Sequence, residues 1–425
     1  MKRIVEASTA VPLVNMSLVF RSGSTLDPAG KEGLSRATGR MLRRGGAGMT
    51  SQQIEETFDA LGAEFSADVG FGWTAVGASV LSRNAEAMAE LVGRLVAEPA
   101  VDEIELGKLR REIEAELIES RDNDQILASR ALRRGIFGSH RHARRVGGYI
   151  PTVRSLTPED IRDHHRQVFC RKNAFLVFSG DLSDRRARHL AELLTARLPE
   201  GTRPADPTGE PEPRPGRHLI FVDKPDRTQT QMYVGSLGSH PHDDDLTPLQ
   251  VATSVLGGTF TARMMQEVRV QRGWSYGAYA RLGLDRHRET FSMWAAPAAS
   301  DAPACLSLLL SLLEAWHKDG VEAEELSFMK RYLRRSHVFE IDTAQKRAQQ
   351  RLSTEVYDLP EGYHETYTER VKAVTRKQAN RAIQERIDPG SLVIAVVGSH
   401  KELGAAVEEA IPGLSSSTVV PYDIE

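Results

Sequence analysis

The chain has 425 residues, too many for a single hydrophobic core, and this length predicts at least two domains. Hydrophobic residues make up 40% of the sequence and charged residues 27%, which is typical of folded, soluble proteins and excludes a disordered or fibrous chain. Because 58 acidic residues oppose 55 basic ones, the formal net charge is only −3, and no overall field would attract nucleic acid or an anionic membrane.

The sequence has no segment with the character of a membrane helix or of a secretory signal. No run approaches the roughly 20 consecutive apolar residues that a spanning helix requires. The first residues are basic, but Glu6 and Pro12 interrupt the apolar core that a signal peptide would need. We therefore expect a cytoplasmic protein, with the periplasm as the alternative if a leader has been removed. Cys170 and Cys305 stand far apart, which predicts packed thiols and no cysteine-based metal site.

In the first part of the chain, strand-like and helix-like segments follow one another. Residues 15–20 are rich in β-branched and apolar side chains and predict a strand. Residues 31–44 place apolar side chains at helical spacing, and Gly45-Gly46 ends the predicted helix. Longer amphipathic helices are predicted over residues 85–98 and 102–121.

A basic stretch over residues 130–145 would suggest nucleic-acid binding if it stood alone. The balanced net charge favours a solvated surface, or a contact with an acidic face of a partner. His164-His165 and the later His240 and His242 have the chemistry of metal ligands but no recognised ligand spacing. We expect these histidines on the surface of helices or loops.

Residues 201–216 carry five prolines. Such a run favours an extended linker, because proline fixes φ and removes a backbone donor. Beyond the linker, a strand is predicted over residues 230–237 and amphipathic helices over residues 302–318 and 324–340.

The parts of the chain on either side of this linker are weak copies of one another. A pattern of apolar and charged residues that opens at Val101 returns at Val321, an offset of 321 − 101 = 220 residues. The apolar strand that ends before Gly180 returns as the strand that ends before Gly398, an offset of 398 − 180 = 218 residues. Nearly equal offsets indicate a duplicated domain.

These observations predict an α+β protein in which one sheet-and-helix domain is used twice. The N-terminal domain is expected over residues 1–200, the proline-rich linker over residues 201–216 and the C-terminal domain over residues 217–425.

Four short motifs lie along the chain: Arg21-Ser22-Gly23-Ser24-x-x-Asp27-Pro28, Leu61-Gly62-Ala63-x-x-x-Ala67, Ser179-Gly180-Asp181 and Gly257-Gly258-x-Phe260-x-x-Arg263. Each motif is weak alone. Their shared order and spacing resemble the pitrilysin and mitochondrial processing peptidase family, the inverted zincins, over almost the whole chain. The resemblance implies two homologous domains of the processing-peptidase type.

In that family a helix carries H-x-x-E-H, in which two histidines bind zinc and the glutamate is the general base; a later glutamate is the third ligand. The matching helix here has Arg36 and Arg40 at the histidine positions and Gly39 at the glutamate position, while Glu116 matches the third ligand. Arginine has no lone pair for a cation and glycine offers no base, so we expect no metal on this chain. We predict that Glu116 accepts hydrogen bonds from Arg36 or Arg40. The alternative is a solvated helix face.

The second half contains an Arg-x6-Tyr element, Arg269 and Tyr276, which resembles the family's substrate-holding pair. Arg269 is predicted in the last turn of a helix that Gly273 ends in the left-handed conformation, and Tyr276 at the start of the next strand. Both side chains would then converge on one spot. The alternative is that Arg269 only complements the helix dipole while Tyr276 fills a core edge.

The resemblance therefore implies the non-zinc subunit of a heterodimeric zinc metallopeptidase. Such a subunit is inactive alone and supplies Arg269 and Tyr276 to a homologous partner subunit that holds the zinc, with peptides as substrates and no nucleic acid. Two alternatives stay open: a non-catalytic structural subunit of the core-protein type found in respiratory complexes, and a stand-alone peptide-binding homodimer. The sequence names neither the substrate nor the partner.

Overall fold

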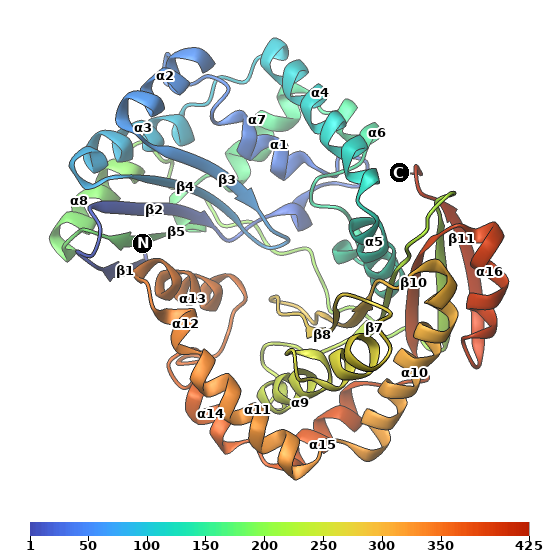
Figure 1. Ribbon diagram of the computed structural model, residues 1–425. Coiled ribbons are helices and arrows are strands. Elements are labelled where there is room, and N and C mark those ends of the chain that lie inside the picture. The colour runs from blue at the N-terminus through green and yellow to red at the C-terminus, as the bar shows by residue number, and fades with distance from the viewer. Residues whose placement is uncertain (425) are drawn as a thin grey trace. The chain divides into compact units, whose positions relative to one another are not determined.

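The computed structural model describes residues 1–424 and divides them into two compact units (Figure 1). Unit 1 comprises residues 1–117, 144–208 and 339–356. Unit 2 comprises residues 118–143, 209–338 and the described residues from Tyr357 onward. Each unit contains one mixed sheet covered by helices, so the predicted α+β fold is confirmed.

The sheet of unit 1 has five strands in the order β1-β5-β2-β4-β3. Strands β1 and β5 run parallel, and the other neighbouring pairs run antiparallel. Strand β5 is fully buried, whereas every residue of the edge strand β3 is at least partly exposed. The strands are β1 (Arg3–Ala7), β2 (Leu13–Phe20), β3 (Glu64–Val69), β4 (Thr74–Leu81) and β5 (Ala174–Gly180).

The helices of unit 1 start and stop at recognisable signals. A capping box between Thr50 and Gln53 starts α2, and Gly62 in the left-handed conformation ends it. Buried apolar side chains of α3 and α8 pack with those of β2, β4 and β5 to form the main core of the unit. The helices are α1 (Leu34–Met41), α2 (Ser51–Leu61), α3 (Ala85–Ala97), α4 (Glu103–Glu119), α6 (Ile150–Arg154), α7 (Pro158–Val168), α8 (Asp184–Thr195), α12 (Val338–Ile341) and α13 (Ala344–Val356).

The sheet of unit 2 has six strands in the order β11-β6-β10-β7-β9-β8. Without β11, this order corresponds strand for strand to that of unit 1, which supports the predicted duplication. Strand β8 is an edge strand that pairs with β9. The strands are β6 (Arg217–Asp223), β7 (Gln231–Leu237), β8 (Ala278–Leu282), β9 (Thr290–Ala295), β10 (Leu392–Gly398) and β11 (Leu414–Pro421).

Helices α9, α10 and α15 form the main core of unit 2 together with the sheet, and the fully buried Trp316 lies within this core. Gly257, at the end of α9, allows this helix to approach β8 closely, since a Cβ there would lie 2.1 Å from the backbone N of Ala280. The helices are α5 (Asp124–Phe137), α9 (Leu246–Gly257), the π-helix η6 (Met265–Gln271), α10 (Ala302–Asp319), α11 (Ala323–Ser336), α14 (Tyr367–Ala373), α15 (Arg376–Arg386) and α16 (His400–Glu409).

Each unit takes one helix from the other half of the sequence (Figure 1). Helix α5 packs on β7 and β10 of unit 2, and helix α13 packs on β1 and β5 of unit 1. The two helices begin at Asp124 and Ala344, an offset of 344 − 124 = 220 residues, which is the offset of the internal repeat. The same helix of each repeat is therefore exchanged between the two halves.

Several sequence predictions agree with the structure in outline. The strand predicted over residues 15–20 lies within β2, the strand predicted over residues 230–237 begins one residue before β7, and both cysteines are buried. Residues 201–215 form neither helix nor strand. In the described part of the chain, no helix combines the length and apolar character needed to cross a membrane.

Other predictions need correction. Strands β1 and β6 were missed, and the helix predicted over residues 324–340 ends at Ser336. The basic stretch is not simply a solvated surface, because α5 packs on the sheet of unit 2 and Arg133 pairs with the buried Glu289, their Nη1 and Oε2 atoms 3.1 Å apart. His164 is buried, contrary to the expected surface position.

Candidate functional site

Helix α1 presents the degenerate zinc-site positions of unit 1. Its buried side chains Leu34, Ala37 and Met41 pack with apolar residues of α4 and α7. The opposite side of the helix carries Arg36 and Arg40, which are only partly buried. Packing of the apolar face therefore directs both guanidinium groups away from the core.

The N-terminus of α1 is fixed by a buried carboxylate that sequence reasoning did not single out as a site residue. Asp27 accepts hydrogen bonds from the backbone N–H groups of Gly33 and Ser35, both at 2.9 Å, and from the Ser35 hydroxyl at 2.6 Å. The same hydroxyl oxygen lies 3.1 Å from Nε2 of His164. Burial raises the pKa of Asp27 to about 6 and lowers the pKa of His164 to about 4.

Asp27, Ser35 and His164 have the residue types of a nucleophilic triad, but their arrangement differs from one. In a triad the histidine lies between the serine and the carboxylate, whereas here Ser35 lies between Asp27 and His164. None of the three residues is more than 4% exposed. The group is therefore a buried anchor for α1.

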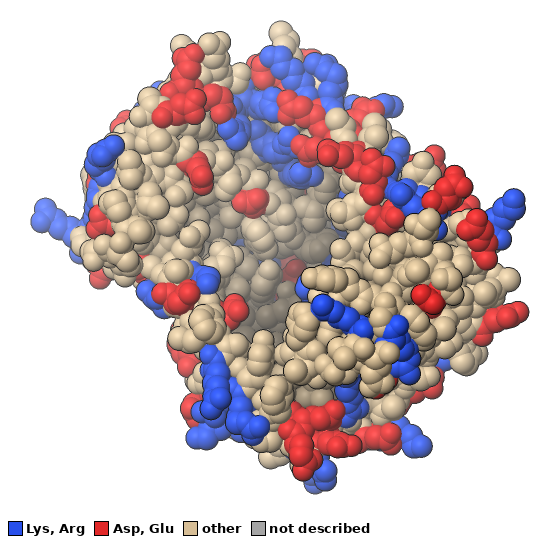
Figure 2. All heavy atoms as spheres, in the orientation of Figure 1, with Lys and Arg blue, Asp and Glu red and all other residues tan. Residues whose placement is uncertain are grey.

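Glu116 of α4 joins the two arginines across the degenerate zinc site. Its carboxylate accepts from Arg36 Nη2 at 3.0 Å and lies 2.8 Å from Arg40 Nη1. The predicted hydrogen bonds are therefore present. Glu112, one turn earlier, pairs with Arg40 and with Arg44, and basic and acidic side chains intermingle over α1 and α4 in Figure 2. Because these groups remain partly exposed, solvent screening limits what the pairs add to stability.

These residues do not fit a zinc ion. Arg36 and Arg40 present only N–H donors, and Glu116 already accepts from both. Among residues 1–424, no group of three or more His, Cys, Asp or Glu side chains is arranged to hold a metal. Gly39, at the position of the family's general base, has no side chain that could activate water.

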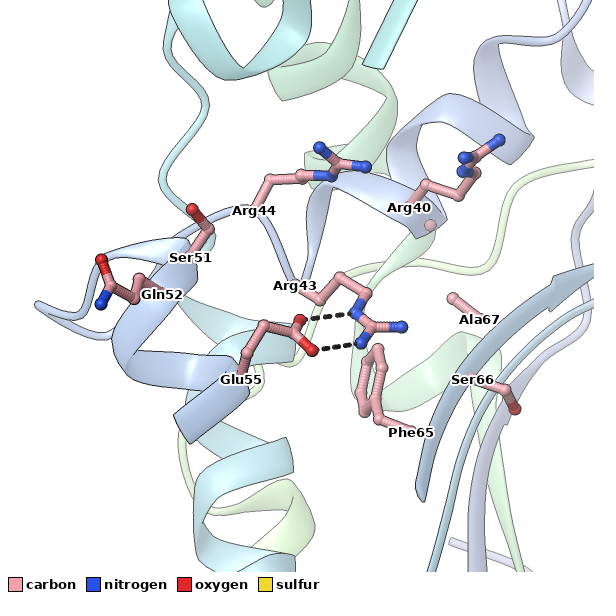
Figure 3. A pocket seen from close by; sticks show the side chains of 10 residues that line it. Arg40, Arg43, Arg44, Ser51, Gln52, Glu55, Phe65, Ser66 and Ala67 are labelled. Carbon is pink, nitrogen blue, oxygen red and sulfur yellow. Dashed lines mark hydrogen bonds and ion pairs between the residues drawn. The ribbon is translucent and has the colours of Figure 1, made fainter. Parts of the chain in front are cut away.

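A hollow of about 490 Å³ lies next to this site, between α1, α2 and the edge strand β3 (Figure 3). Its lining includes Gly39, Arg40 and Phe65. Across the hollow, Arg43 donates two hydrogen bonds to Glu55 of α2, at 2.9 and 2.6 Å, and the two side chains point toward one another in Figure 3. The hollow is therefore bordered by charges that already have partners.

In unit 2 the structure brings Arg269 and Tyr276 together. Arg269 lies on η6, a π-helix, and such segments are frequent at functional sites. Gly273 follows with φ of +67°, the left-handed conformation that was predicted. Tyr276 does not begin a strand as expected, since it lies two residues before β8. The centre of the Arg269 guanidinium is 4.7 Å from the centroid of the Tyr276 ring.

Arg269 differs from its neighbours in having no acceptor. Arg263 is paired with Glu325 and Arg272 with Glu267. Within residues 1–424, by contrast, no hydrogen bond or ion pair reaches Arg269, and its Nη1 atom is buried without a partner. Tyr276 beside it is 85% exposed. The pair therefore combines an unsatisfied cation with an accessible phenol.

The duplicated fold and the degenerate site define a class of protein, a metallopeptidase-like chain without zinc ligands of its own. Residues 3–148 match the family described as Insulinase (Peptidase family M16), and residues 155–333 match the family described as Peptidase M16 inactive domain. The chain belongs to the M16 peptidase family. At the zinc-site positions of the family, this member has Arg36, Gly39 and Arg40.

Relatives of known sequence or structure are similar over nearly the whole chain. A Helicobacter pylori protein named non-peptidase homolog YmxG is 21% identical over 401 residues, covering 94% of this chain and 92% of that protein. The Mycobacterium tuberculosis protein named uncharacterized zinc protease Rv2782c is 25% identical over 413 residues, with the same coverage of 94% and 92%. The crystal structure of a peptidase M16 inactive domain from Pseudomonas fluorescens has a similar fold, with a TM-score of 0.85 and 24% identity over 93% of this chain and 95% of that chain.

Proposed function

We propose that this chain is the non-zinc subunit of a heterodimeric zinc metallopeptidase and holds peptides for hydrolysis at a homologous, zinc-bearing partner subunit. One contrast carries the proposal. The arginines in the degenerate zinc site donate hydrogen bonds to a carboxylate, whereas Arg269 has no acceptor and lies beside the exposed Tyr276. A purely structural subunit would have no need of an unpaired guanidinium next to an exposed phenol.

The chemistry of the pair suits a peptide. The guanidinium of Arg269 and the hydroxyl of Tyr276 donate hydrogen bonds to peptide carbonyl oxygens, and to the oxyanion that forms when water attacks one. Hydrolysis itself depends on the partner, because Arg36, Gly39 and Arg40 supply neither a metal ligand nor a base.

The edge strand β8 gives the peptide a backbone to pair with. Its outer side has no neighbouring strand in the sheet order, and Tyr276 precedes the strand by two residues. An extended peptide added to this edge would form main-chain hydrogen bonds that depend little on its sequence. Its carbonyl groups would then lie close to Tyr276 and Arg269. We also infer a cytoplasmic complex, in which the thiols of Cys170 and Cys305 stay reduced.

The test is to mix purified subunits. Alone, this chain is expected to bind no stoichiometric zinc and to cleave no fluorogenic peptide, and a homologous chain with an intact H-x-x-E-H helix should gain peptidase activity when the two are combined. Arg269→Ala and Tyr276→Phe should each lower kcat/KM of the mixture by roughly a hundredfold, the typical cost of removing one oxyanion-type donor. Arg272→Ala is the matched control, since Arg272 lies three residues after Arg269 and is already paired with Glu267.

The outcomes separate the alternatives. Full activity of the mixture with both Arg269→Ala and Tyr276→Phe would remove the substrate-holding role. A stable complex whose activity is the same with and without this chain would favour a structural subunit. Peptide binding by this chain as a homodimer, with no gain of activity on mixing, would favour the stand-alone peptide-binding protein.

A further inference from the structure

A second aromatic ring contacts the guanidinium of Arg269. The centroid of the Phe260 ring lies 4.6 Å from its central carbon, almost the same distance as the Tyr276 ring at 4.7 Å. Phe260 follows α9, while Tyr276 follows the π-helix, so two separate turns deliver the rings to one cation. Both distances lie within the range in which the face of an aromatic ring attracts a guanidinium.

Phe260 contributes little to the core of unit 2. It is 64% exposed and is one of the large apolar side chains that the unit leaves in solvent. Packing therefore does not explain its position, whereas contact with Arg269 does. The two rings contact the guanidinium and limit its rotation, but they do not neutralise its charge as the carboxylates of Glu325 and Glu267 do for Arg263 and Arg272.

We propose that Phe260 is a positioning residue for Arg269, and that Phe260, Arg269 and Tyr276 together form a subsite for a carboxylate. This proposal rests on the proposed function for the presence of a peptide, and it adds the class of group that the peptide presents. The carboxylate is either the C-terminus of the peptide or an Asp or Glu side chain.

The charge balance of the subsite favours an anion over a neutral carbonyl. Glu267, the acidic residue on the same π-helix, is already paired with Arg272. Arg269 is left as a positive charge with unsatisfied donors, including the buried Nη1, and its partly exposed side chain is open to a ligand. A carboxylate satisfies two N–H groups at once and neutralises the charge, whereas one carbonyl oxygen does neither as well.

The experiment measures binding to the full-length chain without a partner, by fluorescence anisotropy of labelled peptides. Three peptides of the same alanine and serine sequence are compared: one with a free C-terminal carboxylate, one amidated at the C-terminus, and one amidated but carrying an internal Glu. We expect at least one carboxylate peptide to bind about tenfold or more tightly than the neutral amide, as for hydrogen bonds to charged groups. The peptide that binds more tightly than the neutral amide identifies the source of the carboxylate, either the C-terminus or the Glu side chain.

Variants then assign the residues. Arg269→Ala should abolish the difference between carboxylate and amide peptides, and Arg272→Ala should preserve it. Phe260→Leu keeps an apolar side chain of similar size but removes the ring, and it should weaken carboxylate binding by about two- to fivefold. Phe260→Tyr should restore it. Because Phe260 is exposed, thermal unfolding should be unchanged in these variants.

Three results would overturn the inference or separate it from the proposed function. Equal, Arg269-dependent binding of all three peptides would exclude the carboxylate subsite but leave the peptide-holding pair intact. Wild-type binding by Phe260→Leu would exclude the positioning role of Phe260. Carboxylate binding that needs Arg269, in a complex whose peptidase activity does not, would support the subsite and contradict the proposed function.

Discussion

At the scale of single residues, burial rather than sequence motif decides the chemistry of the anchor beneath α1. Asp27 keeps three hydrogen bonds that favour its ionised form, yet desolvation outweighs them and raises its pKa to about 6. His164 is shifted the other way, to about 4, because burial disfavours the imidazolium. Two neighbouring groups thus have opposite effects on how stability depends on pH.

The folded-state pKa of Asp27 exceeds its ordinary value of 3.8, so its contribution to stability is complete below about pH 3.8 and is lost as the pH rises through 6. The folded-state pKa of His164 lies below its ordinary value of 6.5, so its contribution is present above about pH 6.5 and is lost as the pH falls toward 4. Each shift of about two pKa units corresponds to roughly 3 kcal/mol, and the two nearly cancel between pH 4 and 6.5.

Asp27→Asn should expose the histidine contribution alone. The amide oxygen can still accept from the backbone N–H of Ser35, whereas the NH2 group that replaces the other carboxylate oxygen faces the N–H of Gly33 and lowers stability at every pH. The side chain no longer titrates, so the pH dependence that remains comes from His164. The free energy of unfolding of this variant, relative to wild type, should therefore rise by about 3 kcal/mol between pH 4 and pH 7. Urea unfolding at several pH values measures this, with the exposed Asp59→Asn as the control. Parallel pH profiles for Asp27→Asn and wild type would show that the raised pKa of Asp27 does not contribute to the pH dependence of stability.

The hydrogen bonds of the degenerate zinc site were predictable from sequence, whereas the anchor was not. Arg36, Arg40 and Glu116 occupy positions that a known family uses for one ion, so their proximity followed from the alignment of motifs. The contact between Ser35 and His164 joins residues 129 positions apart and depends on how α7 packs against α1. No local pattern in the sequence encodes it.

At the scale of secondary structure, the exchanged helix α13 is held by both apolar and charged contacts. Ala344, Ala348, Leu352 and Val356 recur every four residues and are buried. Glu6 of β1 pairs with Arg347 and Arg351. The helix therefore covers β1, the strand at the edge of the unit 1 sheet.

Leu352→Ala should destabilise this cover. The side chain is only 8% exposed, and loss of a buried leucine typically costs about 2–4 kcal/mol in the free energy of unfolding. Hydrogen exchange should accelerate in β1 and β5 of unit 1 and remain unchanged in β10 of unit 2. Gln349→Ala, on the exposed side of the same helix, should change stability by less than about 0.5 kcal/mol. Equal effects of the two substitutions would show that α13 does not act as a cover.

Strong periodic patterns predicted the longer elements, whereas context determined the rest. Helices such as α3 and α10 match their predicted spans within about two residues, because their apolar faces repeat over several turns. Strand β1 was missed since its five residues include two charged ones, Arg3 and Glu6, and since it depends on pairing with β5. The π-helix that carries Arg269 was predicted only as a helix, because an i to i+5 hydrogen-bond pattern has no distinct sequence signature.

At the scale of the whole molecule, the exchanged helices tie each unit to both halves of the sequence. Residues 1–208 contain α5 but not the β7 and β10 strands it packs on, and they lack α13. Residues 209–425 contain α13 but not the β1 and β5 strands it packs on, and they lack α5. The domain boundaries predicted from the linker, residues 1–200 and 217–425, therefore separate each exchanged helix from its sheet.

Separate expression of residues 1–208 and 209–425 should consequently give two chains that do not unfold cooperatively on their own. Each fragment would leave the apolar faces of a helix and of a sheet in water. The cost in folding free energy is about 25 cal/mol for every Å² of apolar surface left exposed. Co-expression, with an affinity tag on one fragment, should recover both as a complex. As a control, the full chain cleaved after folding between Thr208 and Gly209 should stay associated. A monomeric, cooperatively folded fragment of residues 1–208 would show instead that α13 is dispensable.

The helix exchange also determines when, during translation, each sheet can be covered by its helix. The ribosome releases the strands of unit 1 early, but α13 emerges only after residue 356 has been added. At about 5–20 residues per second, the ribosome needs roughly 7–30 s to translate the stretch from residue 209 to residue 356. During that interval β1 and β5 are not covered by α13, and α5 cannot pack because β10 has not yet been synthesised. The nascent chain therefore presents two uncovered apolar surfaces at once, and a chaperone that binds such surfaces would have its longest opportunity before α13 leaves the exit tunnel.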